Sequence, residues 1–304
     1  MSGPTTTVPT GTDTGGPNRP SSTGPRENKL SVLLATGGLV VAALYFLIPI
    51  WWLVVASSKS QATLVTTGGL WFASPFQLFS NVSDLFAFRD SLYLRWLANS
   101  VGYALLGAGF GTLFAVMAGY ALAKYFFRGR EVVFNLILGG VLVPATALAL
   151  PLFLMFSQVG LVNTYWAVFL PSLVSPFGVY LARIYAAASV PEPLLEAARL
   201  DGASEFRAFF VIALRLMKPA LVTIFLFQFV VIWNNFFLPL VMLSDQRLFP
   251  ITLGLYTWNS SINQAPELRL FVIVGSLVSI LPLLIAFLGL QRFWQSGLSA
   301  GGVK

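Results

Sequence analysis

The sequence contains neither cysteine nor histidine among its 304 residues. Without cysteine the chain can form no disulfide and no thiolate metal site. Without histidine it lacks the commonest general base and the commonest metal ligand. We therefore predict that this chain has no catalytic residue and no metal site, and that it is not an enzyme.

Charged residues are also scarce, at 10% of the chain against roughly 25% in soluble domains. Hydrophobic residues instead make up 57%. More polar runs separate six apolar stretches, each long enough for the about 20 residues that a membrane-spanning helix needs. The stretches are approximately 31–56, 96–123, 133–157, 166–187, 220–243 and 270–293. We predict an all-α integral membrane protein with six transmembrane helices and no separate soluble domain.

The first 30 residues are rich in glycine, proline, serine and threonine and contain no aromatic residue. Such a segment buries too little apolar surface to offset the entropy lost on ordering. We predict a disordered tail over residues 1–30 and a transmembrane domain over 31–304. The apolar run from Leu33 to Ala56 is longer than the core of a secretory signal, so we expect it to remain as an anchor.

Lysine and arginine are distributed unevenly between the predicted loops. Thirteen of the 18 fall in the N-terminal tail, the loop 124–130, the segment 183–218 and the C-terminal end, and five fall in the loops between. Cytoplasmic loops carry the excess of positive charge in membrane proteins. Both termini and the segment Glu192–Lys218 are therefore predicted to be cytoplasmic.

Small residues recur every four positions in the second apolar stretch, at Gly107, Gly111, Ala115 and Gly119. Residues four apart share one face of a helix, and small side chains there let another helix approach closely. This pattern predicts tight packing against a helix of this chain or of a partner. It does not by itself predict dimerisation.

Ionisable residues are nearly absent from the predicted spans, whereas proton- and sodium-coupled carriers usually keep a carboxylate or histidine there. The polar groups of the fifth span are instead uncharged, and they lie among aromatic rings. Amides both donate and accept hydrogen bonds, so this set suits a neutral, hydroxyl-rich solute. The candidate pathway residues are Gln228, Trp233, Asn234 and Asn235. The alternative is that these amides bond between helices.

The loop 188–219 is unusually polar for this chain. Proline in the first turn predicts a helix over Pro193–Leu200, and Gly202 can take the left-handed conformation that ends helices. Ser204 is the predicted cap of a second helix. One face of that helix would contain Phe206, Phe209, Phe210, Ala213 and Met217. Acidic and basic residues balance between Glu192 and Lys218, which favours a protein partner over anionic lipid, with a solvated connecting loop as the alternative.

The stretch "EAARLDGASEFRAFFVIALR", Glu196–Arg215, resembles the EAA loop of ABC importer permeases. Arg215 stands where the family pattern has proline, so the second helix is expected to continue there without the usual break. The resemblance implies that this loop contacts an ATPase. The residues that would do so are Glu196, Ala197, Ala198, Asp201, Gly202, Ile212 and Leu214.

Two further stretches, "WNNFFLPLVML" and "LQRFWQSGLSAGGVK", are similar to parts of the carbohydrate-uptake permeases, in particular the smaller maltose-importer permease. The resemblance implies a type I permease fold with both termini inside, in the bacterial cytoplasmic membrane. It also implies a second permease subunit, two ATP-binding subunits and an extracytoplasmic solute-binding protein. ATP and Mg would be bound by the ATPase, with no cofactor on this chain.

The function expected from this resemblance is ATP-driven, binding-protein-dependent import of a sugar or oligosaccharide. The segment around Glu196–Gly202 would be the coupling helix, and the tail near Gln295–Lys304 would add a second ATPase contact. A secondary carrier or channel for a small neutral solute and a membrane scaffold that transports nothing are the alternatives.

Overall fold

The computed structural model describes residue 3 and residues 29–300, with side-chain surroundings from 30 to 291. The predicted disordered tail lies almost entirely outside the described residues, and its last two residues already belong to the first helix. The expected contact near Gln295–Lys304 falls where no side chain is described. The chain divides into two compact units, residues 1–48 and 49–304.

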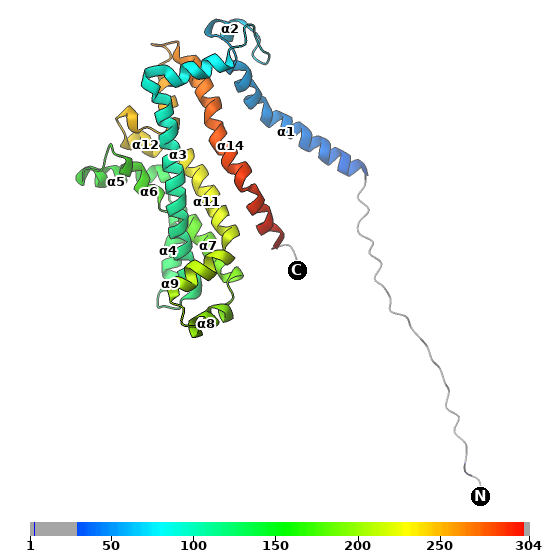
Figure 1. The fold of residues 1–304 in the computed structure, drawn as a ribbon, viewed down its shortest axis with the longest axis vertical. Coiled ribbons are helices and arrows are strands. Elements are labelled where there is room, and N and C mark those ends of the chain that lie inside the picture. The colour runs from blue at the N-terminus through cyan, green and yellow to red at the C-terminus, as the bar shows by residue number, and fades with distance from the viewer. Residues whose placement is uncertain (1–2, 4–28, 301–304) are drawn as a thin grey trace. The chain divides into compact units, whose positions relative to one another are not determined.

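Every regular element among the described residues is helical (Figure 1). The elements before the polar loop are α1 (Lys29–Ser57), α2 (Gln61–Thr66), α3 (Leu78–Lys124), α4 (Arg130–Val141), α5 (Ala145–Gln158), α6 (Tyr165–Ser172) and α7 (Pro176–Ser189). The loop itself forms α8 (Glu192–Leu200), α9 (Glu205–Arg207), the π-helical turn η1 (Ala208–Ala213) and α10 (Leu214–Leu216). The remaining elements are α11 (Lys218–Trp233), α12 (Phe237–Met242), the 3-10 turn η2 (Gln246–Leu248), α13 (Ile251–Ser260) and α14 (Leu268–Ala300).

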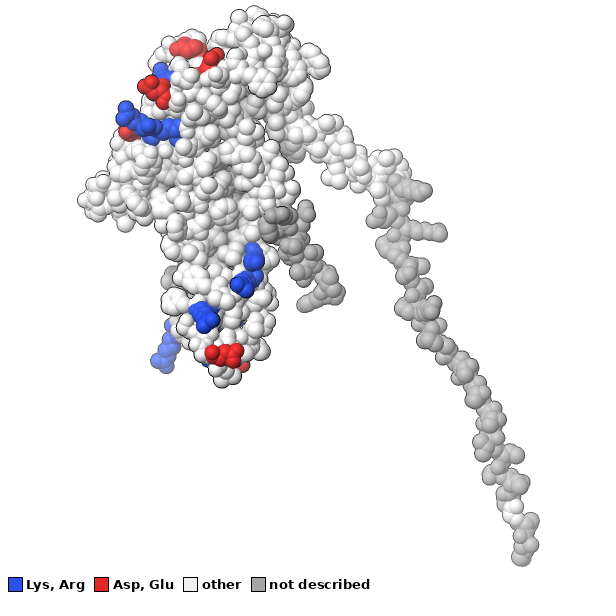
Figure 2. Space-filling model, viewed as in Figure 1, with Lys and Arg blue, Asp and Glu red and all other residues white. Residues whose placement is uncertain are grey.

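Four of the six predicted spans correspond to helices long and apolar enough to cross a membrane. They are Leu30–Ser57, Leu78–Lys124, Tyr165–Ser189 and Leu268–Gln291. The third predicted span is a pair of helices, α4 and α5, bent by 102°. The count reaches six only if each of the two bent pairs is one span. Charged side chains gather at the two ends of the second unit, and the band between them is uncharged in the view of Figure 2.

The fifth predicted span, 220–243, is not one continuous helix. Helix α11 ends at Trp233, residues 234–236 are not helical, and α12 is a short separate helix. Proline explains the break, because the ring of Pro239 would clash with the carbonyl of the residue four positions earlier, Asn235, in an unbroken helix. Pro144 stands in the same way at the break between α4 and α5.

Helix α3 is longer than the predicted second span. Positive φ angles at Arg89, Asp90 and Ser91 separate an initial segment, 78–88, from the long part that follows. The initial segment runs across the upper end of the second unit in Figure 1, and the long part then descends toward α8. Helices α2 and α13 were not predicted.

The small-residue face of α3 packs within this chain, which confirms the predicted tight packing. A Cβ atom at Gly119 would lie 2.5 Å from the Cβ of Ala182 on α7. A Cβ atom at Gly107 would lie 2.8 Å from the Cδ1 of Ile232 on α11. Both distances are below any ordinary contact. Backbone atoms of α7 also crowd Gly119, so only glycine fits there, whereas the end of the Ile232 side chain can shift away from Gly107.

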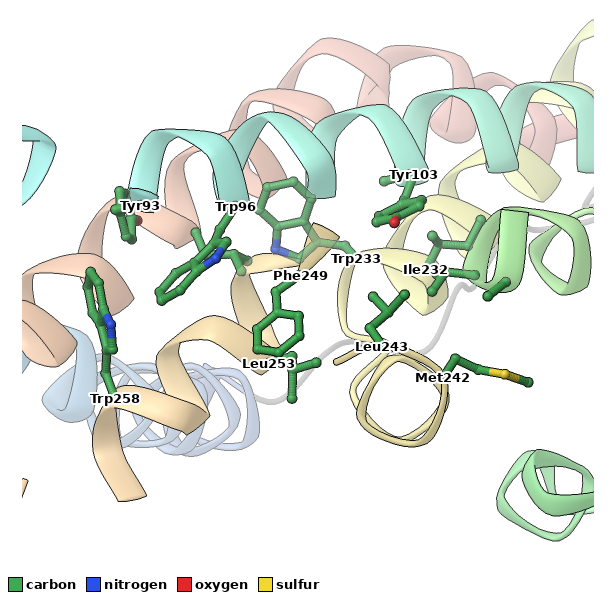
Figure 3. Packing of buried hydrophobic residues seen from close by; sticks show 14 of the residues in the cluster. Tyr93, Trp96, Tyr103, Ile232, Trp233, Met242, Leu243, Phe249, Leu253 and Trp258 are labelled. Atoms are coloured by element: carbon green, nitrogen blue, oxygen red, sulfur yellow. The ribbon is translucent and has the colours of Figure 1, made fainter. Parts of the chain in front are cut away.

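Two buried clusters hold the second unit together. The aromatic cluster lies along the upper part of α3 and includes, as labelled in Figure 3, Tyr93, Trp96, Tyr103, Ile232, Trp233, Met242, Leu243, Phe249, Leu253 and Trp258. The alanine-rich cluster lies along the lower part of α3. Its buried members are Ala115, Val116, Tyr120, Leu122, Val179, Ala182, Ala186, Val190, Leu195, Ala208, Phe209, Ala213, Met217 and Ile224.

Candidate functional site

Helix α8 ends in the turn that the sequence predicts. Gly202 has a φ of 81°, the left-handed region that glycine adopts without strain. The amide of Gly202 donates to the carbonyl of Arg199 at 3.0 Å, and that of Ala203 donates to Ala198 at 2.9 Å. These two bonds are the Schellman pattern, which satisfies the last carbonyls of a helix. The predicted helix stop at Asp201 and Gly202 is therefore confirmed.

The second helix of the loop begins as predicted but winds differently. Ser204 accepts a hydrogen bond from the amide of Arg207 at 3.4 Å, so it caps the helix. The next residues form a π-helical turn, which adds residues to the turn and shifts the buried face. Phe209 is buried, whereas Phe206 is 73% exposed and Phe210 is 46% exposed. The predicted face is thus correct at Phe209, Ala213 and Met217 and wrong at the other two positions.

Arg215 does not remove the break that follows the loop. The helix continues through Arg215 to Leu216, and the chain then bends by 81° at Met217 into α11. Pro219 lies in the first turn of α11. Its ring would clash with the carbonyl of Arg215 if the helix continued, so the break is displaced rather than lost. The expectation of an unbroken helix is wrong.

The predicted contact residues divide between an exposed edge and a buried face. Glu196, Ala197 and Asp201 are exposed, and Leu200 beside them is 89% exposed. Ala198 is buried, and Leu195 on the same helix belongs to the alanine-rich cluster. The two adjacent alanines therefore differ, because only the first is available to a partner. Helix α8 forms the lower tip of the second unit in Figure 1.

Ile212 and Leu214 are half-buried and lie in the second helix of the loop, η1 and α10. Leu214 packs against the alanine-rich cluster. The structure therefore separates the motif into a presented part on α8 and a supporting part on the second helix. Their roles in contact with an ATPase stay predictions.

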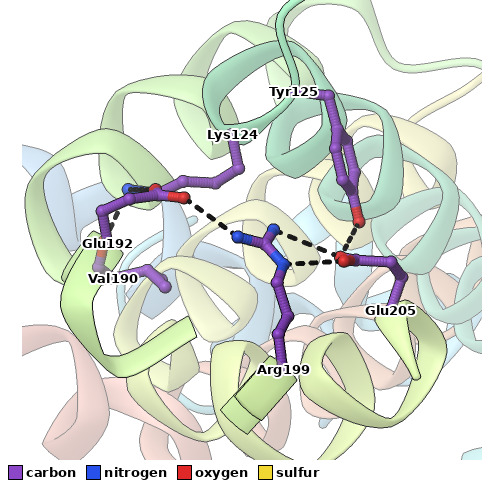
Figure 4. Close-up of polar contacts among 6 residues, drawn as sticks. All are labelled: Lys124, Tyr125, Val190, Glu192, Arg199 and Glu205. Atoms are coloured by element: carbon purple, nitrogen blue, oxygen red, sulfur yellow. Dashed lines mark hydrogen bonds and ion pairs between the residues drawn. The ribbon is translucent and has the colours of Figure 1, made fainter. Parts of the chain in front are cut away.

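An ionic network joins both helices of the loop (Figure 4). The Arg199 Nε donates to Glu205 Oε1 at 2.7 Å, which links α8 to α9 across the Gly202 turn. The Arg199 Nη1 also lies 3.4 Å from Glu192 Oε1 within α8. Hydrogen bonding to Arg199, and next to the Tyr125 hydroxyl, lowers the pKa of Glu205 below its usual range.

The network continues to the end of α3. The Tyr125 hydroxyl donates to Glu205 Oε2 at 2.7 Å, and the Lys124 Nζ donates to the carbonyl of Val190 at 2.5 Å. Lys124 also lies 3.8 Å from Glu192. The end of α3 thus holds both helices of the loop. This role was not predicted, because no spacing in the sequence relates Lys124 and Tyr125 to a loop about 70 residues later.

The network also changes the meaning of the charge balance in the loop. Arg199 pairs with both Glu192 and Glu205, and Lys124 at the end of α3 also pairs with Glu192, so two basic and two acidic groups balance across the network. Among the described residues, no ion pair is found for Glu196 or Asp201 within 4.0 Å. The carboxylates of these two residues are therefore the acidic groups that α8 and its turn present to solvent.

The four candidate pathway residues do not form one surface. Gln228 is buried and its Nε2 donates to the carbonyl of Ser172 at 2.7 Å, which is the interhelical bond that the alternative describes. Trp233 is buried and stacks on Phe229 with 5.9 Å between ring centroids.

Asn234 and Asn235 occupy the break after α11. The Asn234 side chain is exposed and donates to the carbonyl of Val230 at 2.8 Å. The carbonyl of Asn235 accepts a hydrogen bond from Thr252 Oγ1 at 2.8 Å. Asn234 is therefore the member of the four that most readily meets a solute, and the assignment of a pathway stays a prediction. Across the described part of the chain, no group of three or more acidic side chains could hold a metal ion.

Comparison with known proteins defines the family. Residues 111–299 match the model of the binding-protein-dependent transport system inner membrane component. The chain belongs to this family. It is 36% identical to the arabinooligosaccharides transport system permease protein AraQ of Halalkalibacterium halodurans, over 89% of this chain and 96% of that one. It is 32% identical to the lactose transport system permease protein LacG of Rhizobium radiobacter, over 88% and 94%.

A solved structure has the same fold. A bacterial ABC transporter involved in the import of the acidic polysaccharide alginate has a chain that aligns with a TM-score of 0.77 at 24% identity, covering 88% of this chain and 98% of that chain. The protein is therefore a permease of a binding-protein-dependent ABC importer, with several helices in the bacterial inner membrane. It is a transport subunit rather than an enzyme. These findings do not favour a secondary carrier or a channel.

Proposed function

We propose that this permease imports a sugar or an oligosaccharide, using conformational change that a separate ATPase supplies. Two relatives support the solute class, because AraQ is an arabinooligosaccharide permease and LacG is a lactose permease. The observation that carries the mechanism is the exposed edge of α8, which the Schellman turn at Gly202 holds at the tip of the second unit.

The proposed topology has six spans with both termini in the cytoplasm. In this topology α4 and α5 together form the third span. The fifth span begins with α11, and the second loop helix before it lies outside the membrane. The excess of lysine and arginine supports a cytoplasmic position for loop 188–219. Residues 1–30 are then a cytoplasmic tail, and residues 31–304 form the permease domain.

The proposed assembly contains a second permease, two ATP-binding subunits and an extracytoplasmic solute-binding protein. A solved alginate transporter supports the last component, since it was obtained in complex with an alginate pentasaccharide-bound periplasmic protein and has a related fold at a TM-score of 0.56. ATP and Mg belong on the ATPase. This chain then receives the energy of hydrolysis through a cytoplasmic contact.

In the proposed contact, α8 presents Glu196, Ala197 and Leu200 to the ATPase. Gly202 permits the turn that places this edge, and Leu195 fixes α8 in the alanine-rich cluster. Displacement of α8 is transmitted to α3 because Arg199 and Glu205 connect it to the Tyr125 hydroxyl. The network therefore makes the loop and the end of α3 move as one body.

The proposed solute pathway passes the break at residues 234–236. Non-helical backbone at membrane depth is tolerated where protein buries it or where it lines an aqueous cavity. Thr252 satisfies the Asn235 carbonyl, and the exposed Asn234 amide offers hydrogen bonds to a passing hydroxyl group. Gln228 and Trp233 support this region from within the protein.

The test is uptake by the complete importer in vesicles, measured with a panel of labelled sugars, with and without ATP and the binding protein. We expect saturable uptake of one sugar class that requires both. Uptake driven by a proton or sodium gradient alone would contradict the proposal. ATP-dependent uptake of a solute other than a sugar would retain the coupling mechanism and contradict the solute class.

A second test of the proposal examines only the genes that neighbour the gene for this chain. We expect a second six-span permease with its own EAA loop and a secreted binding protein to be encoded beside this chain. An ATPase gene can lie elsewhere and serve several importers.

A further inference from the structure

An ordered loop covers the end of the second unit opposite to α8 (Figure 1). It comprises residues 60–79, which follow the end of α1, contain α2 and include the first two residues of α3. We call it the aromatic platform. No Asp, Glu, Lys or Arg occurs from residue 60 to residue 83.

Large apolar side chains project from the aromatic platform. Trp71 is 72% exposed and Phe79 is 81% exposed. Val65, Leu70, Phe72 and Phe76 are also exposed. In Figure 2 the surface around α2 shows no charged side chain. A soluble surface rarely gathers this much apolar area, so a partner or a lipid phase covers it.

The aromatic platform rests on a buried polar base. Lys59 is 1% exposed, and its Nζ donates to the carbonyl of Gly68 at 2.6 Å. Asn81 Nδ2 donates to the carbonyls of Ser57 and Lys59 at 2.8 and 2.9 Å. These bonds hold both ends of the loop, so its rings project from a fixed backbone.

Contacts with the end of α1 set the depth of the aromatic platform in the membrane. The Trp51 Nε1, near that end, donates to the carbonyl of Leu70 at 3.0 Å. The Trp51 ring also contacts Phe72 edge-on at 5.5 Å between centroids. Phe72 in turn contacts Phe76, which contacts Phe79. A span that ends in tryptophan places those rings at the boundary between acyl chains and headgroups.

We infer that the aromatic platform is a lipid-contact surface that lies in the headgroup region of the membrane. The absence of charge, the exposed rings and the continuity with the end of a span all fit this environment. The outer leaflet follows from the proposed cytoplasmic position of α8, and only this choice of leaflet rests on the proposed function.

The absence of cysteine from the natural chain makes a direct test possible. Trp71→Cys would carry the one nitroxide label of this chain in the complete importer, assembled with partner chains whose cysteines have been replaced and reconstituted in phosphatidylcholine and phosphatidylglycerol vesicles. Ser83→Cys is the matched control, because Ser83 is exposed on the initial segment of α3 beside Asp84. Collisions of each label with oxygen, which concentrates in lipid, are compared with collisions with a water-soluble nickel chelate.

We expect the oxygen-to-nickel collision ratio at Trp71→Cys to exceed that at Ser83→Cys several-fold, with and without the binding protein. Equal ratios would overturn the inference in favour of an aqueous surface. Low collision rates with both reagents would overturn it in favour of a protein partner. If Trp71→Cys does not assemble, Phe76→Cys tests the same surface. The measurement needs no turnover, so its failure and a failure of sugar uptake are distinguishable.

Discussion

The two ends of the second unit are held together by different means. At the end near α2 and α13, large rings fill the interior and side chains bond directly to backbone: Trp96 Nε1 donates to the carbonyl of Gln246 at 2.7 Å. At the end near α8, small residues bring helix backbones together, and an ionic network fixes the loop. A Cβ atom at Gly119 would lie 2.7 Å from the backbone nitrogen of Arg183.

At the α8 end backbone lies against backbone, so no side chain there can move aside. The end that we propose receives force from the ATPase is thus the end where displacement of one helix must displace the next. We expect the most severe effects of substitution where this rigid packing is disturbed.

The largest effect is expected from Gly119→Val. The added side chain would overlap Ala182 and the backbone of α7, so α3 and α7 must separate. Overpacking costs about 1–3 kcal/mol, and more where backbone blocks relaxation, as here. Thermal unfolding in detergent should show a large loss of stability. Gly109→Val is the matched control, since nothing lies within 4 Å of that position on the same helix. Equal stability of the two variants would contradict close packing at Gly119.

A smaller effect is expected from Glu205→Gln, which removes the charge that Arg199 and Tyr125 share. The loop should still fold, because the Schellman turn remains. Displacement of α8 would then reach α3 less completely, so uptake should fall more than ATP hydrolysis. Glu267→Gln, an exposed carboxylate at the opposite end, is the control. An unchanged ratio of uptake to ATP hydrolysis would show that the network does not transmit displacement of α8 to α3.

The stability difference between wild type and Glu205→Gln has a defined pH dependence. Because the folded pKa of Glu205 lies below its usual 4.5, the contribution of its ionised form is fully present above that value and is lost only as pH falls through the lowered pKa. The difference in stability between wild type and Glu205→Gln should therefore be constant from neutral pH down to about 5. A difference that disappears between pH 6 and 7 would exclude Glu205 as its source.

The smallest effect is expected from Tyr125→Phe. This change removes one hydrogen bond to Glu205 and leaves the Arg199 contact in place. The ratio of uptake to ATP hydrolysis should fall less than in Glu205→Gln. A larger loss in Tyr125→Phe would mean that the link to α3, rather than the link across the turn, dominates.

Local sequence features predicted much of this structure. The length of the apolar stretches predicted four of the spans. Gly202 predicted the turn and Ser204 predicted the helix cap, because each of these features depends on a few adjacent residues. The small-residue face of α3 was also predictable from spacing alone.

The remaining features depend on residues far apart in the chain. The π-helical turn changes which face is buried, and no propensity marks its position. Gln228 bonds to a carbonyl 56 residues away, and Tyr125 to a carboxylate 80 residues away. Proline marked the broken spans, but it also occurs inside α1 and α14, which are unbroken. Proline alone therefore could not show which helices would break.

The most direct test of the central claim compares two glycines in the reconstituted importer. Gly202 and Gly129 have φ angles of 81° and 86°, and both have open space around the Cβ position. Valine at either position therefore adds similar backbone strain, about 1–2 kcal/mol. The account expects Gly202→Val to insert normally, bind the ATPase weakly and abolish uptake, while Gly129→Val retains uptake. Full uptake by Gly202→Val, or equal loss in both variants, would contradict the claim that force enters through the α8 turn.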